Sequence, residues 1–531
     1  MSDDPRPPMT RRDLLALIGA AAGGSVMYQA MTSLGHAAES NYRPLALDGD
    51  AKGASVVILG AGLAGMVAAL ELRKAGYTVR VLEYGGRAGG RTWTLRGGDR
   101  YTEMGGFAQH CAFDKGLYFN PGPWRIPFHH RAILDYCKRL KVALEPFVQV
   151  NYNAYLHAQD AFAGKPLRYR QIAADFNGGI AELLAKATAQ GKLDEAVSKE
   201  DKETLLEALR GWGALDANYA YTAGAATSDR RGYESDPGGG LSGAPVPSTP
   251  LALRDILNAG IWQGLVPGSI YEFQSTMFQP VGGMDRIAHA FAREVGDLIR
   301  FDAKVTAIRQ DGQCVTVTYE DTKSGGAPQT FSADWCVCTI PLSILNQIEM
   351  NVSAAMAAAI AAVPYAPAVK VGLQMKRRFW EEDEAIYGGI TTTDLPIRNI
   401  GYPCTDYGHP GKGVLLGAYA IVDTYAYELS ALPPPERVAK AVEWGAQIHP
   451  QYKDEFENGV AVAWHRNPAT LGCFAKWSDE ARKRHYDDLC RIDGRIALAG
   501  EHASYLPAWQ EGAILSALDA VARLHRRVVA G

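Results

Sequence analysis

Three glycines and one acid are the first residues of this chain whose types and spacing could do chemistry. Gly60, Gly62 and Gly65 follow a short apolar run, and Glu83 stands at the end of the next one. Such glycines permit a tight turn, let backbone N–H groups approach a pyrophosphate, and allow a helix to pack closely on a strand. The diphosphate would lie at the positive end of that helix, and Glu83 would accept hydrogen bonds from an adenosine ribose. The pattern predicts a dinucleotide site.

The elements that must position these residues can be read from the flanking sequence. Ser55–Leu59 is apolar and β-branched, with the length of a buried parallel strand. Residues 66–75 have the periodicity of an amphipathic helix, and Thr78–Leu82 reads as a second strand that leads into Glu83. A strand, a glycine turn, a helix and a second strand make a βαβ unit, which is far more specific than the glycines alone. The alternative is a glycine-rich surface turn.

The whole chain has the composition of an ordinary soluble protein. Its 531 residues predict two or three domains, with 47% hydrophobic and 21% charged residues. The net charge of −4 argues against nucleic acid as a main partner. The eight cysteines contain no CxxC pair, and the spacing of Cys336 and Cys338 suits neither a disulfide nor a zinc site. We therefore expect buried thiols and no metal.

The N-terminus predicts export. Arg11 and Arg12 precede a mildly hydrophobic run that ends near Gly35 in a small-x-small pattern. This resembles a twin-arginine signal over residues 1–38, which predicts a periplasmic or secreted protein. An uncleaved membrane anchor is the alternative, but glycines and polar residues interrupt the run. We expect no stable membrane insertion after cleavage.

Five separated motifs together resemble those of flavin-containing amine oxidases of the monoamine oxidase/L-amino-acid oxidase superfamily, closest to bacterial L-amino-acid oxidases. The resemblance runs from Gly53 to the C-terminus. The motifs are the glycines of 60–65, GGRAGGR at 85–91, PVGGMDRI at 280–287, Lys370 with Phe379-Trp380 after it, and AGEH with AWQEGAI at 499–514.

The resemblance implies an α/β fold in three parts. A discontinuous, Rossmann-like FAD-binding domain would comprise 53–105, 276–342 and 485–531. A mixed-sheet substrate-binding domain would comprise 106–130 and 343–484. A helical domain would cover 131–275, and its irregular stretch 227–249 is expected to be a lid or entrance loop.

The same resemblance implies FAD as the cofactor and a set of residues that contact it. A glycine pair at 105–106 is expected close to the flavin ring, and Glu501 near the ribityl-diphosphate. The implied contacts are Gly60, Ala61, Gly62, Leu63, Ala64, Gly65, Glu83, Tyr84, Gly85, Gly86, Arg87, Gly90, Arg91, Met104, Gly105, Gly106, Phe107, Val305, Gly500, Glu501, Gln510, Glu511 and Ala513.

One catalytic residue is implied. Lys370 matches a lysine that reaches flavin N5 through a water in the superfamily; otherwise it would be a snorkelling edge residue. The family's chemistry removes a hydride from the carbon that bears the amine, and O2 then reoxidises the flavin to give hydrogen peroxide. Because the flavin carries this step, the protein need only bind, orient and desolvate the substrate.

Arg125 is the residue that decides between substrates. The stretch WRIPFHHR at 124–131 resembles a motif of L-amino-acid oxidases whose arginine holds the substrate carboxylate, a pairing matched to the guanidinium fork. An ion pair at the entry to a helix is the alternative. By the same resemblance Tyr402 would be a second carboxylate contact, the Ala508 carbonyl would accept from the substrate amine, and Trp509 and Trp464 would wall the site.

The chain also departs from the family pattern. Residues 108–119 separate the glycine pair from Arg125, whereas relatives join the two almost directly. No histidine lies between His157 and His289, so a histidine base in the helical domain has no candidate. Cys473 follows Trp464 at the spacing at which monoamine oxidases attach flavin covalently. We expect non-covalent FAD and keep the Cys473 linkage as the alternative.

The leading hypothesis is an FAD-dependent L-amino-acid oxidase that converts an L-amino acid and O2 to a 2-oxo acid, ammonia and H2O2. One alternative is an amine oxidase for monoamines or polyamines without a carboxylate. Another is an amide-forming amino-acid 2-monooxygenase, and a third is a non-catalytic flavoprotein. The aromatic residues expected around the substrate suggest a roomy, mostly apolar pocket. The sequence leaves open which amino-acid side chain the enzyme prefers and whether it forms a homo-oligomer.

Overall fold

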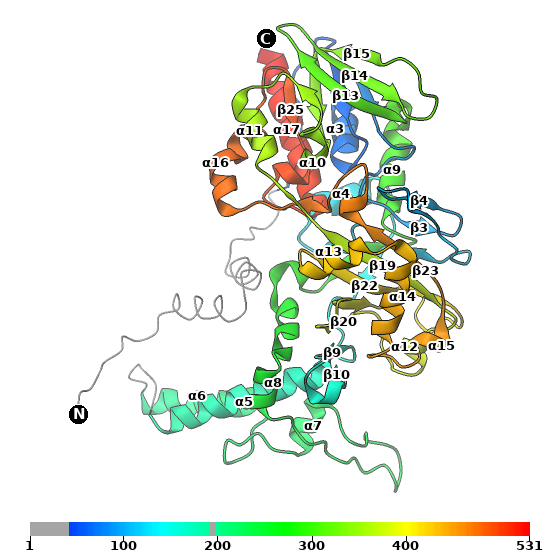
Figure 1. The fold of residues 1–531 in the computed structure, drawn as a ribbon. Coiled ribbons are helices and arrows are strands. Elements are labelled where there is room, and N and C mark those ends of the chain that lie inside the picture. The colour runs from blue at the N-terminus through cyan, green and yellow to red at the C-terminus, as the bar shows by residue number, and fades with distance from the viewer. Residues whose placement is uncertain (1–41, 192–197, 531) are drawn as a thin grey trace, which may run out of the picture.

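A five-stranded parallel sheet carries the βαβ unit (Figure 1). Its strands are ordered β12 (Ile299–Arg300), β2 (Thr78–Leu82), β1 (Ser55–Leu59), β16 (Trp335–Cys338) and β25 (Ile496–Leu498). They come from three distant parts of the chain, and every neighbouring pair runs parallel. The structure, a computed structural model, describes residues 42–191 and 198–530. The predicted export signal lies outside them.

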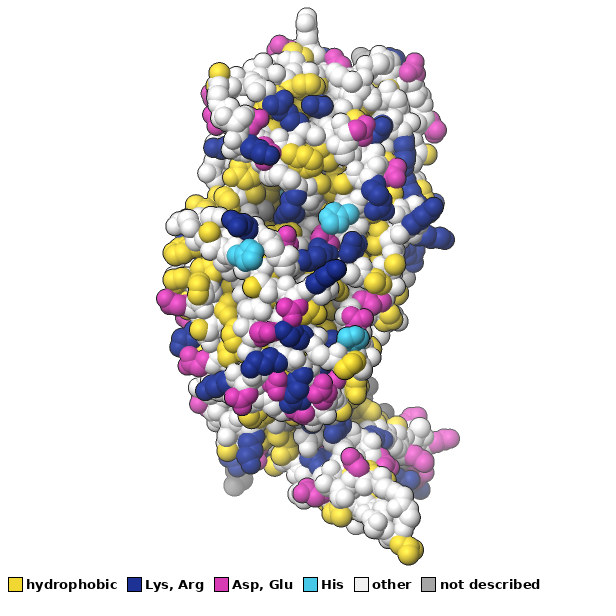
Figure 2. All heavy atoms as spheres, turned by 90° about the vertical axis from the view of Figure 1, so that its right-hand side faces the viewer, with side chains coloured by type: hydrophobic (Ala, Val, Ile, Leu, Met, Phe, Trp, Pro, Cys, Tyr) yellow, Lys and Arg dark blue, Asp and Glu magenta, His cyan; other side chains and the backbone are white. Residues whose placement is uncertain are grey.

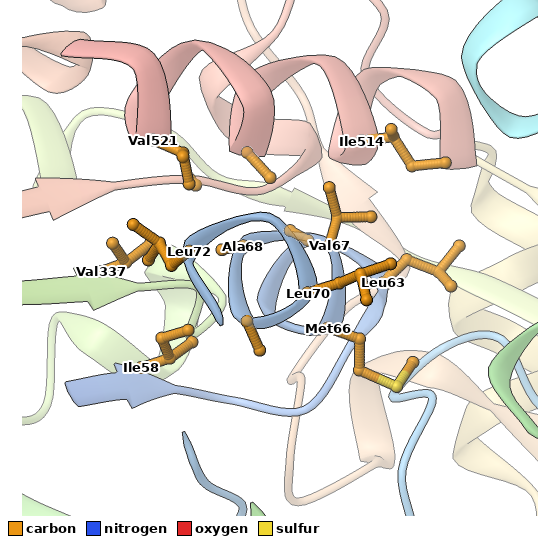
Figure 3. Packing of buried hydrophobic residues seen from close by; sticks show 14 of the residues in the cluster. Ile58, Leu63, Met66, Val67, Ala68, Leu70, Leu72, Val337, Ile514 and Val521 are labelled. Carbon is orange, nitrogen blue, oxygen red and sulfur yellow. The ribbon is translucent and has the colours of Figure 1, made fainter. Parts of the chain in front are cut away.

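Helix α3 (Leu63–Lys74) follows the glycine turn and starts three residues earlier than its periodicity predicted. It packs between the sheet and α17 (Gln510–Ala530), against Ile58 and Val337 on one side and Ile514 and Val521 on the other (Figure 3). Residues 63–72 are all buried, so the helix is enclosed rather than amphipathic. This packing fixes the helix N-terminus at the carboxyl end of β1.

A second, four-stranded sheet stands beside the first. It contains β13 (Ala303–Gln310), β14 (Val315–Asp321), β15 (Gln329–Ala333) and β17 (Glu349–Met350). Strands β12 and β13 are separated at Asp302, which has φ 59°, so that they join different sheets.

A seven-stranded mixed sheet forms the middle of the molecule. Its order is β10 (Leu167–Arg168), β9 (Tyr155–His157), β20 (Ile390–Thr393), β21 (Asn399–Gly401), β22 (Gly413–Ile421), β19 (Ala368–Met375) and β23 (Phe456–Ala463). Strand β19 lies between β22 and β23 and is buried along its whole length. Lys370 is therefore an interior residue, not a snorkelling residue at a sheet edge.

A helical part extends from this sheet, at the end of the molecule away from the parallel sheet (Figure 1). It comprises α5 (Tyr169–Ala189), α6 (Lys199–Gly213), α7 (Ala225–Arg231), α8 (Leu253–Asn258) and two short 3-10 helices, η3 (Ile261–Ser269) and η4 (Tyr271–Phe273). The buried pair Arg231–Asp175 ties α7 to α5, with 2.8 Å between Nε and Oδ1.

Shorter elements connect these parts. A three-stranded sheet contains β7 (Ile126–Pro127), β11 (Met277–Pro280) and β8 (Leu144–Phe147). The others are β3 (Leu95–Arg96), β4 (Arg100–Thr102), β5 (Ala108–His110), β6 (Tyr118–Phe119), α4 (Arg131–Arg139), α9 (Asp285–Val295), η5 (Gly296–Leu298), α10 (Leu342–Leu345), α11 (Ala354–Ala361), β18 (Tyr365–Ala366), α12 (Phe379–Glu382), α13 (Thr424–Ala431), α14 (Pro434–Gly445), α15 (Tyr452–Glu455), η6 (Trp464–Arg466), β24 (Phe474–Ala475), α16 (Asp479–Cys490), η7 (Glu501–Ala503) and η2 (Phe162–Gly164).

Residues 97–117 form an excursion between β3 and β6, which pair with each other. Within it, β4 and β5 make a hairpin whose turn holds Gly105 and Gly106 with φ 93° and 82°. Glu103 anchors the hairpin through a fully buried ion pair with Arg437, at 2.7 Å. The surface turn thus requires glycine at both positions, because both residues have a positive φ.

The surface matches the small net charge. On the face in Figure 2, basic and acidic side chains are interspersed over the lower half of the molecule. Among the residues with assigned positions, no helix has the length and apolar character needed to cross a membrane.

Candidate active site

A cavity of about 1200 Å³ lies where the parallel sheet, the mixed sheet and the helical part meet. It is larger than the roughly 300–1,000 Å³ of an ordinary small-molecule site, so it has room for two ligands. Residues predicted from sequence that line it are Gly60, Gly62, Leu63, Ala64, Glu83, Tyr84, Gly85, Gly86, Arg87, Gly90, Arg91, Met104, Arg125, Val305, Lys370, Trp464, Gly500, Glu501, Ala508, Trp509, Gln510 and Ala513. The loop 227–249 contributes no residue to this lining, and its role as a lid stays a prediction.

The glycine turn has the geometry that a dinucleotide requires. Gly60 has φ 98°, and a Cβ on Gly65 would lie 1.9 Å from the Gly60 carbonyl oxygen. A Cβ on Gly62, in contrast, would meet nothing within 4 Å. Gly65 is therefore required by helix–strand packing, whereas Gly62 leaves open space in the cavity at the N-terminus of α3. That space fits a pyrophosphate.

Glu83 lies at the adjoining end of the cavity. Its carboxylate accepts hydrogen bonds from the backbone N–H groups of Ala61 at 2.6 Å and Gly85 at 2.8 Å. Burial raises the pKa of Glu83, while these bonds and the charge of Arg87 act in the opposite direction. Ala61 serves this local network and does not itself line the cavity.

Arg91 and Glu501 form an ion pair in the cavity wall, with 2.8 Å between Nη1 and Oε1. Glu501 also accepts from the backbone N–H groups of Ala475 and Ala508. This buried carboxylate is thus satisfied by the protein, as a buried charge must be.

Lys370 is buried in the cavity wall with its ammonium group beside aromatic rings. Its Nζ donates a hydrogen bond to the Gly122 carbonyl at 2.6 Å and lies 4.5 Å from the ring centre of Tyr419 and 5.5 Å from that of Trp124. Burial lowers the pKa of Lys370 to about 7, and the charge of Arg125 adds to the shift. Lys370 can therefore hold or release a proton near neutral pH.

Arg125 reaches the same cavity and makes no ion pair with a carboxylate within the described part of the chain. Its Nε is buried and has no hydrogen-bond partner among the residues that the structure describes. The guanidinium carbon lies 4.6 Å from the ring centre of Phe273 and 5.2 Å from that of Trp124. Burial lowers the pKa of Arg125 to about 10, as expected for a desolvated cation. Such a group has the chemistry to bind an anionic ligand.

Tryptophans and a strained alanine complete the wall. The Trp464 indole N–H donates to the Pro121 carbonyl at 2.8 Å, which holds the ring in place. Trp509 packs edge-on against His130, with ring centres 4.9 Å apart. Ala508 has φ 69°, a left-handed conformation that favours glycine.

Four of the predicted contacts do not fit the structure. The Tyr402 hydroxyl lies in the core, bonded to Thr391 Oγ1 at 2.7 Å and His449 Nε2 at 2.6 Å, and so cannot hold a substrate carboxylate. Gly105, Gly106 and Phe107 lie in the exposed hairpin turn and do not line the cavity.

Glu511 is a further correction. Its carboxylate accepts from the backbone N–H groups of Ala132 and Ile133, both at 2.9 Å, and so caps the first turn of α4. It has no place in the cavity lining. The acid two residues after Trp509 is therefore a structural group.

Sequence reasoning missed several lining residues, namely Gly122, Tyr419, Glu272, Phe273 and Gln149. Gly122 approaches the chain so closely that a Cβ would lie 1.9 Å from the Arg91 carbonyl oxygen. The sequence feature that could have revealed Gly122 is the Pro-Gly-Pro at 121–123, directly before the arginine motif. Tyr419 is the register partner of Lys370 on β22, a relation that the sequence alone does not reveal.

Cys473 lines the cavity close to Lys370 and Arg91. Burial raises the pKa of its thiol to about 11, while both neighbouring cations lower it. Arg91 Nη1 donates to the Cys473 carbonyl at 2.7 Å. The position is compatible with a thiol beside a bound flavin. All eight cysteines are free thiols.

Comparisons with known proteins identify the family of this chain. The family model described as flavin containing amine oxidoreductase matches residues 63–525. The chain is 28% identical to the Bacillus subtilis (strain 168) protein named "Putative L-amino-acid oxidase YobN", over 89% of this chain and 94% of that one. It is also 28% identical to an L-amino-acid oxidase of Vipera ammodytes ammodytes, over 89% and 92%.

A solved structure has a similar fold. Cyclohexylamine oxidase from Brevibacterium oxydans IH-35A matches with a TM-score of 0.59 at 17% identity, over 90% of this chain and 99% of that one.

Proposed function

This chain belongs to the flavin-containing amine oxidoreductase family, and from that premise we propose that it is an FAD-dependent L-amino-acid oxidase. The reaction would convert an L-amino acid and O2 to a 2-oxo acid, ammonia and H2O2. FAD would be bound along the glycine turn, Glu83 and the Arg91–Glu501 pair. The L-amino-acid oxidase names of the relatives support the same reading.

One observation carries the proposal: the desolvated guanidinium of Arg125 faces the cavity. A cation in such a site is costly unless a ligand brings an anion. The carboxylate of an amino acid matches the guanidinium fork in shape and charge. A simple amine would leave Arg125 unpaired.

The residues of the chain would bind and orient the substrate and exclude water. A bound flavin would supply the redox chemistry, which is removal of a hydride from the carbon that bears the amine and transfer of two electrons to O2. Arg125 holds the carboxylate, and the Ala508 carbonyl accepts a hydrogen bond from the amine. Trp464 and Trp509 exclude water, and Lys370 keeps a titratable proton beside the reacting centre.

A substrate screen tests the proposal. The purified yellow protein is given L-amino acids and their decarboxylated amines, with peroxide and the organic product followed together. We expect peroxide and 2-oxo acids from amino acids. Oxidation of the amines alone would make the protein an amine oxidase for carboxylate-free substrates, and amide products would make it a monooxygenase.

The state of the flavin has its own measurement. We propose non-covalent binding, because the thiol of Cys473 is held in its neutral form. Denaturation with acid should then release all the flavin into solution. Flavin that stays on the wild-type chain but not on Cys473→Ser would establish the covalent alternative.

Localisation is proposed from the sequence of residues 1–38. We expect export by the twin-arginine pathway to the periplasm or beyond. Replacement of Arg11 and Arg12 by lysine should leave the precursor inside the cell. Equal distribution of both forms on fractionation would remove this proposal.

A further inference from the structure

Two polar side chains at the substrate end of the cavity have no role in the proposed function. Glu272 on η4 and Gln149 after β8 both line the cavity. Neither can hold the α-carboxylate as Arg125 does, because one is an acid and the other is uncharged. We therefore consider which substrate side chain these two residues could bind.

Glu272 lines the cavity next to Phe273, whose ring contacts both Arg125 and Trp509. The next residue, Phe273, has its ring centre 4.6 Å from the Arg125 guanidinium carbon and 6.2 Å from the ring centre of Trp509. Burial raises the pKa of Glu272, whereas hydrogen bonding from Trp509 and the charge of Arg125 act in the opposite direction. The carboxylate is thus a largely desolvated acid beside the proposed carboxylate clamp.

Charge balance shows what this acid needs from a ligand. In the free protein the charge of Arg125 acts on Glu272, but no ion pair joins the two among the residues that the structure describes, and the pKa of Arg125 stays lowered. When a substrate carboxylate pairs with Arg125, it neutralises the cation that acts on Glu272. A buried carboxylate without compensation is costly, so a substrate that brings a second positive charge is favoured.

Gln149 offers a second, independent sign of a polar ligand. The residue is 7% exposed, and its Oε1 has no hydrogen-bond partner within the described chain. Buried amide groups without partners are uncommon in proteins. Rotation of the amide by 180° would exchange its oxygen and nitrogen, and a ligand with N–H donors could then meet the oxygen, since the residue borders the cavity.

The wall around these two groups is largely apolar. Val150, Leu156, Ile390 and Pro267 line the same cavity. An aliphatic substrate side chain fits such a wall. The end of that side chain would meet the hydrogen-bond acceptors of Glu272 and Gln149 rather than donors. The combination matches a long methylene chain that ends in a cation.

We infer that this enzyme prefers L-amino acids with a long aliphatic, cationic side chain, such as L-lysine. Glu272 pairs with the terminal cation, and Gln149 accepts a hydrogen bond from it. The inference rests on the proposed L-amino-acid oxidase function and names the substrate class of the same site.

The test compares L-lysine with L-norleucine, which has the same α-carbon groups and no terminal ammonium. We expect wild type to have the higher kcat/KM for L-lysine. Glu272→Gln should lower the lysine-to-norleucine ratio by roughly 10- to 100-fold, the effect of losing a charge-assisted contact. Gln149→Leu should lower it by roughly 5-fold.

Glu145→Gln is the matched control. Glu145 is an acid on β8 that accepts from Gln279 Nε2 at 2.8 Å and lies outside the cavity lining. Its variant should leave the ratio unchanged. A wild type that prefers norleucine, or a Glu272→Gln variant that slows both substrates equally, would overturn the inference while the oxidase proposal stands. Failure to oxidise any amino acid would overturn both.

A binding measurement needs no variant. Holoenzyme is titrated with 6-aminohexanoate and with hexanoate, which share a carboxylate and differ in the terminal ammonium. We expect 6-aminohexanoate to bind at least about 10-fold more tightly. Equal or tighter binding of hexanoate would contradict a role for Glu272 in cation recognition.

Discussion

Lys370 on β19 and Tyr419 on β22 are register partners, and the lysine Nζ lies 4.5 Å from the centre of the phenol ring. Cross-strand partners project from the same face of a sheet, so both side chains reach the cavity together. The ring faces keep the ammonium group away from water but still attract its charge. This arrangement explains how a lysine can be held inside a mixed sheet with a pKa near neutrality.

The lowered pKa of Lys370 predicts how stability depends on pH. The pKa is about 7 in the folded protein against 10.5 ordinarily, so the unfolded chain binds more protons between these values. The free energy of unfolding should therefore rise with pH in this window. Lys370→Met removes the cost of the buried charge, and its stability advantage over wild type should shrink from pH 7 to pH 10.

Denaturation of both proteins at a series of pH values checks this. An advantage that is constant across the window would mean that Lys370 titrates normally in the folded protein.

Lys370→Met should also slow the reactions of the flavin. The ammonium group lies in the wall of the cavity in which we propose that the flavin binds, whereas Met keeps the bulk and loses the charge. We expect the larger effect on reoxidation by O2, where a nearby cation offsets developing negative charge. Rapid mixing separates reduction from reoxidation, and unchanged rates in both would exclude Lys370 from the active site.

Replacement of Arg125 by Met should act on amino acids alone. Loss of the bidentate contact leaves the substrate carboxylate desolvated and should cost about 2–4 kcal/mol, roughly 30- to 1,000-fold in kcat/KM for phenylalanine. Phenethylamine lacks the carboxylate and should lose little. Equal losses for both substrates would show that Arg125 is structural and would favour the amine-oxidase alternative.

Gly62 and Gly65 should respond differently to alanine. A Cβ at Gly65 would collide with the Gly60 carbonyl, so Gly65→Ala should impair folding itself. A Cβ at Gly62 has free space in the protein but enters the proposed diphosphate site. Gly62→Ala should therefore fold and bind FAD weakly, as measured by thermal unfolding and FAD titration. Normal FAD affinity in Gly62→Ala would argue against this location for the diphosphate.

The hairpin at 100–110 depends on a buried ion pair. Arg437 and Glu103 are both fully buried, with Nη1 2.7 Å from Oε1. Arg437→Met leaves the buried Glu103 carboxylate with only the longer ion pair to Arg466, at 3.8 Å, and should lower the free energy of unfolding by about 3 kcal/mol. The exposed pair Lys440–Glu443 provides the control, since Lys440→Met should cost less than about 1 kcal/mol. Similar losses in the two variants would contradict this account.

The predictions that succeeded from sequence concern local features. Strands β1 and β2 have the predicted bounds, because a short apolar run between turns has few other stable conformations. The glycine turn was equally readable, since each glycine has a separate steric reason that depends on residues nearby in the chain. Lys370 and Arg125 were found because each stands in a motif with a definite chemical requirement.

The predictions that failed concern choices between similar residues. Tyr402 is buried and Tyr419 is half-buried, and both lie in or beside strands of one sheet. Only the register of β19 with β22 sets Tyr419 beside Lys370. The glycine pair at 105–106 and Gly122 both precede Arg125. Pairing of β3 with β6 makes 97–117 an excursion and brings Gly122 to the cavity.

The sequence by itself determined the βαβ unit and the type of chemistry, because these depend on residues close together in the chain. Only the tertiary structure decided which acids serve the site. Glu501 pairs with Arg91 in the cavity wall, Glu511 caps α4, and Glu272 enters the cavity from the helical part. The reason is physical: a carboxylate has one chemistry, and the partners that packing brings to it decide its role.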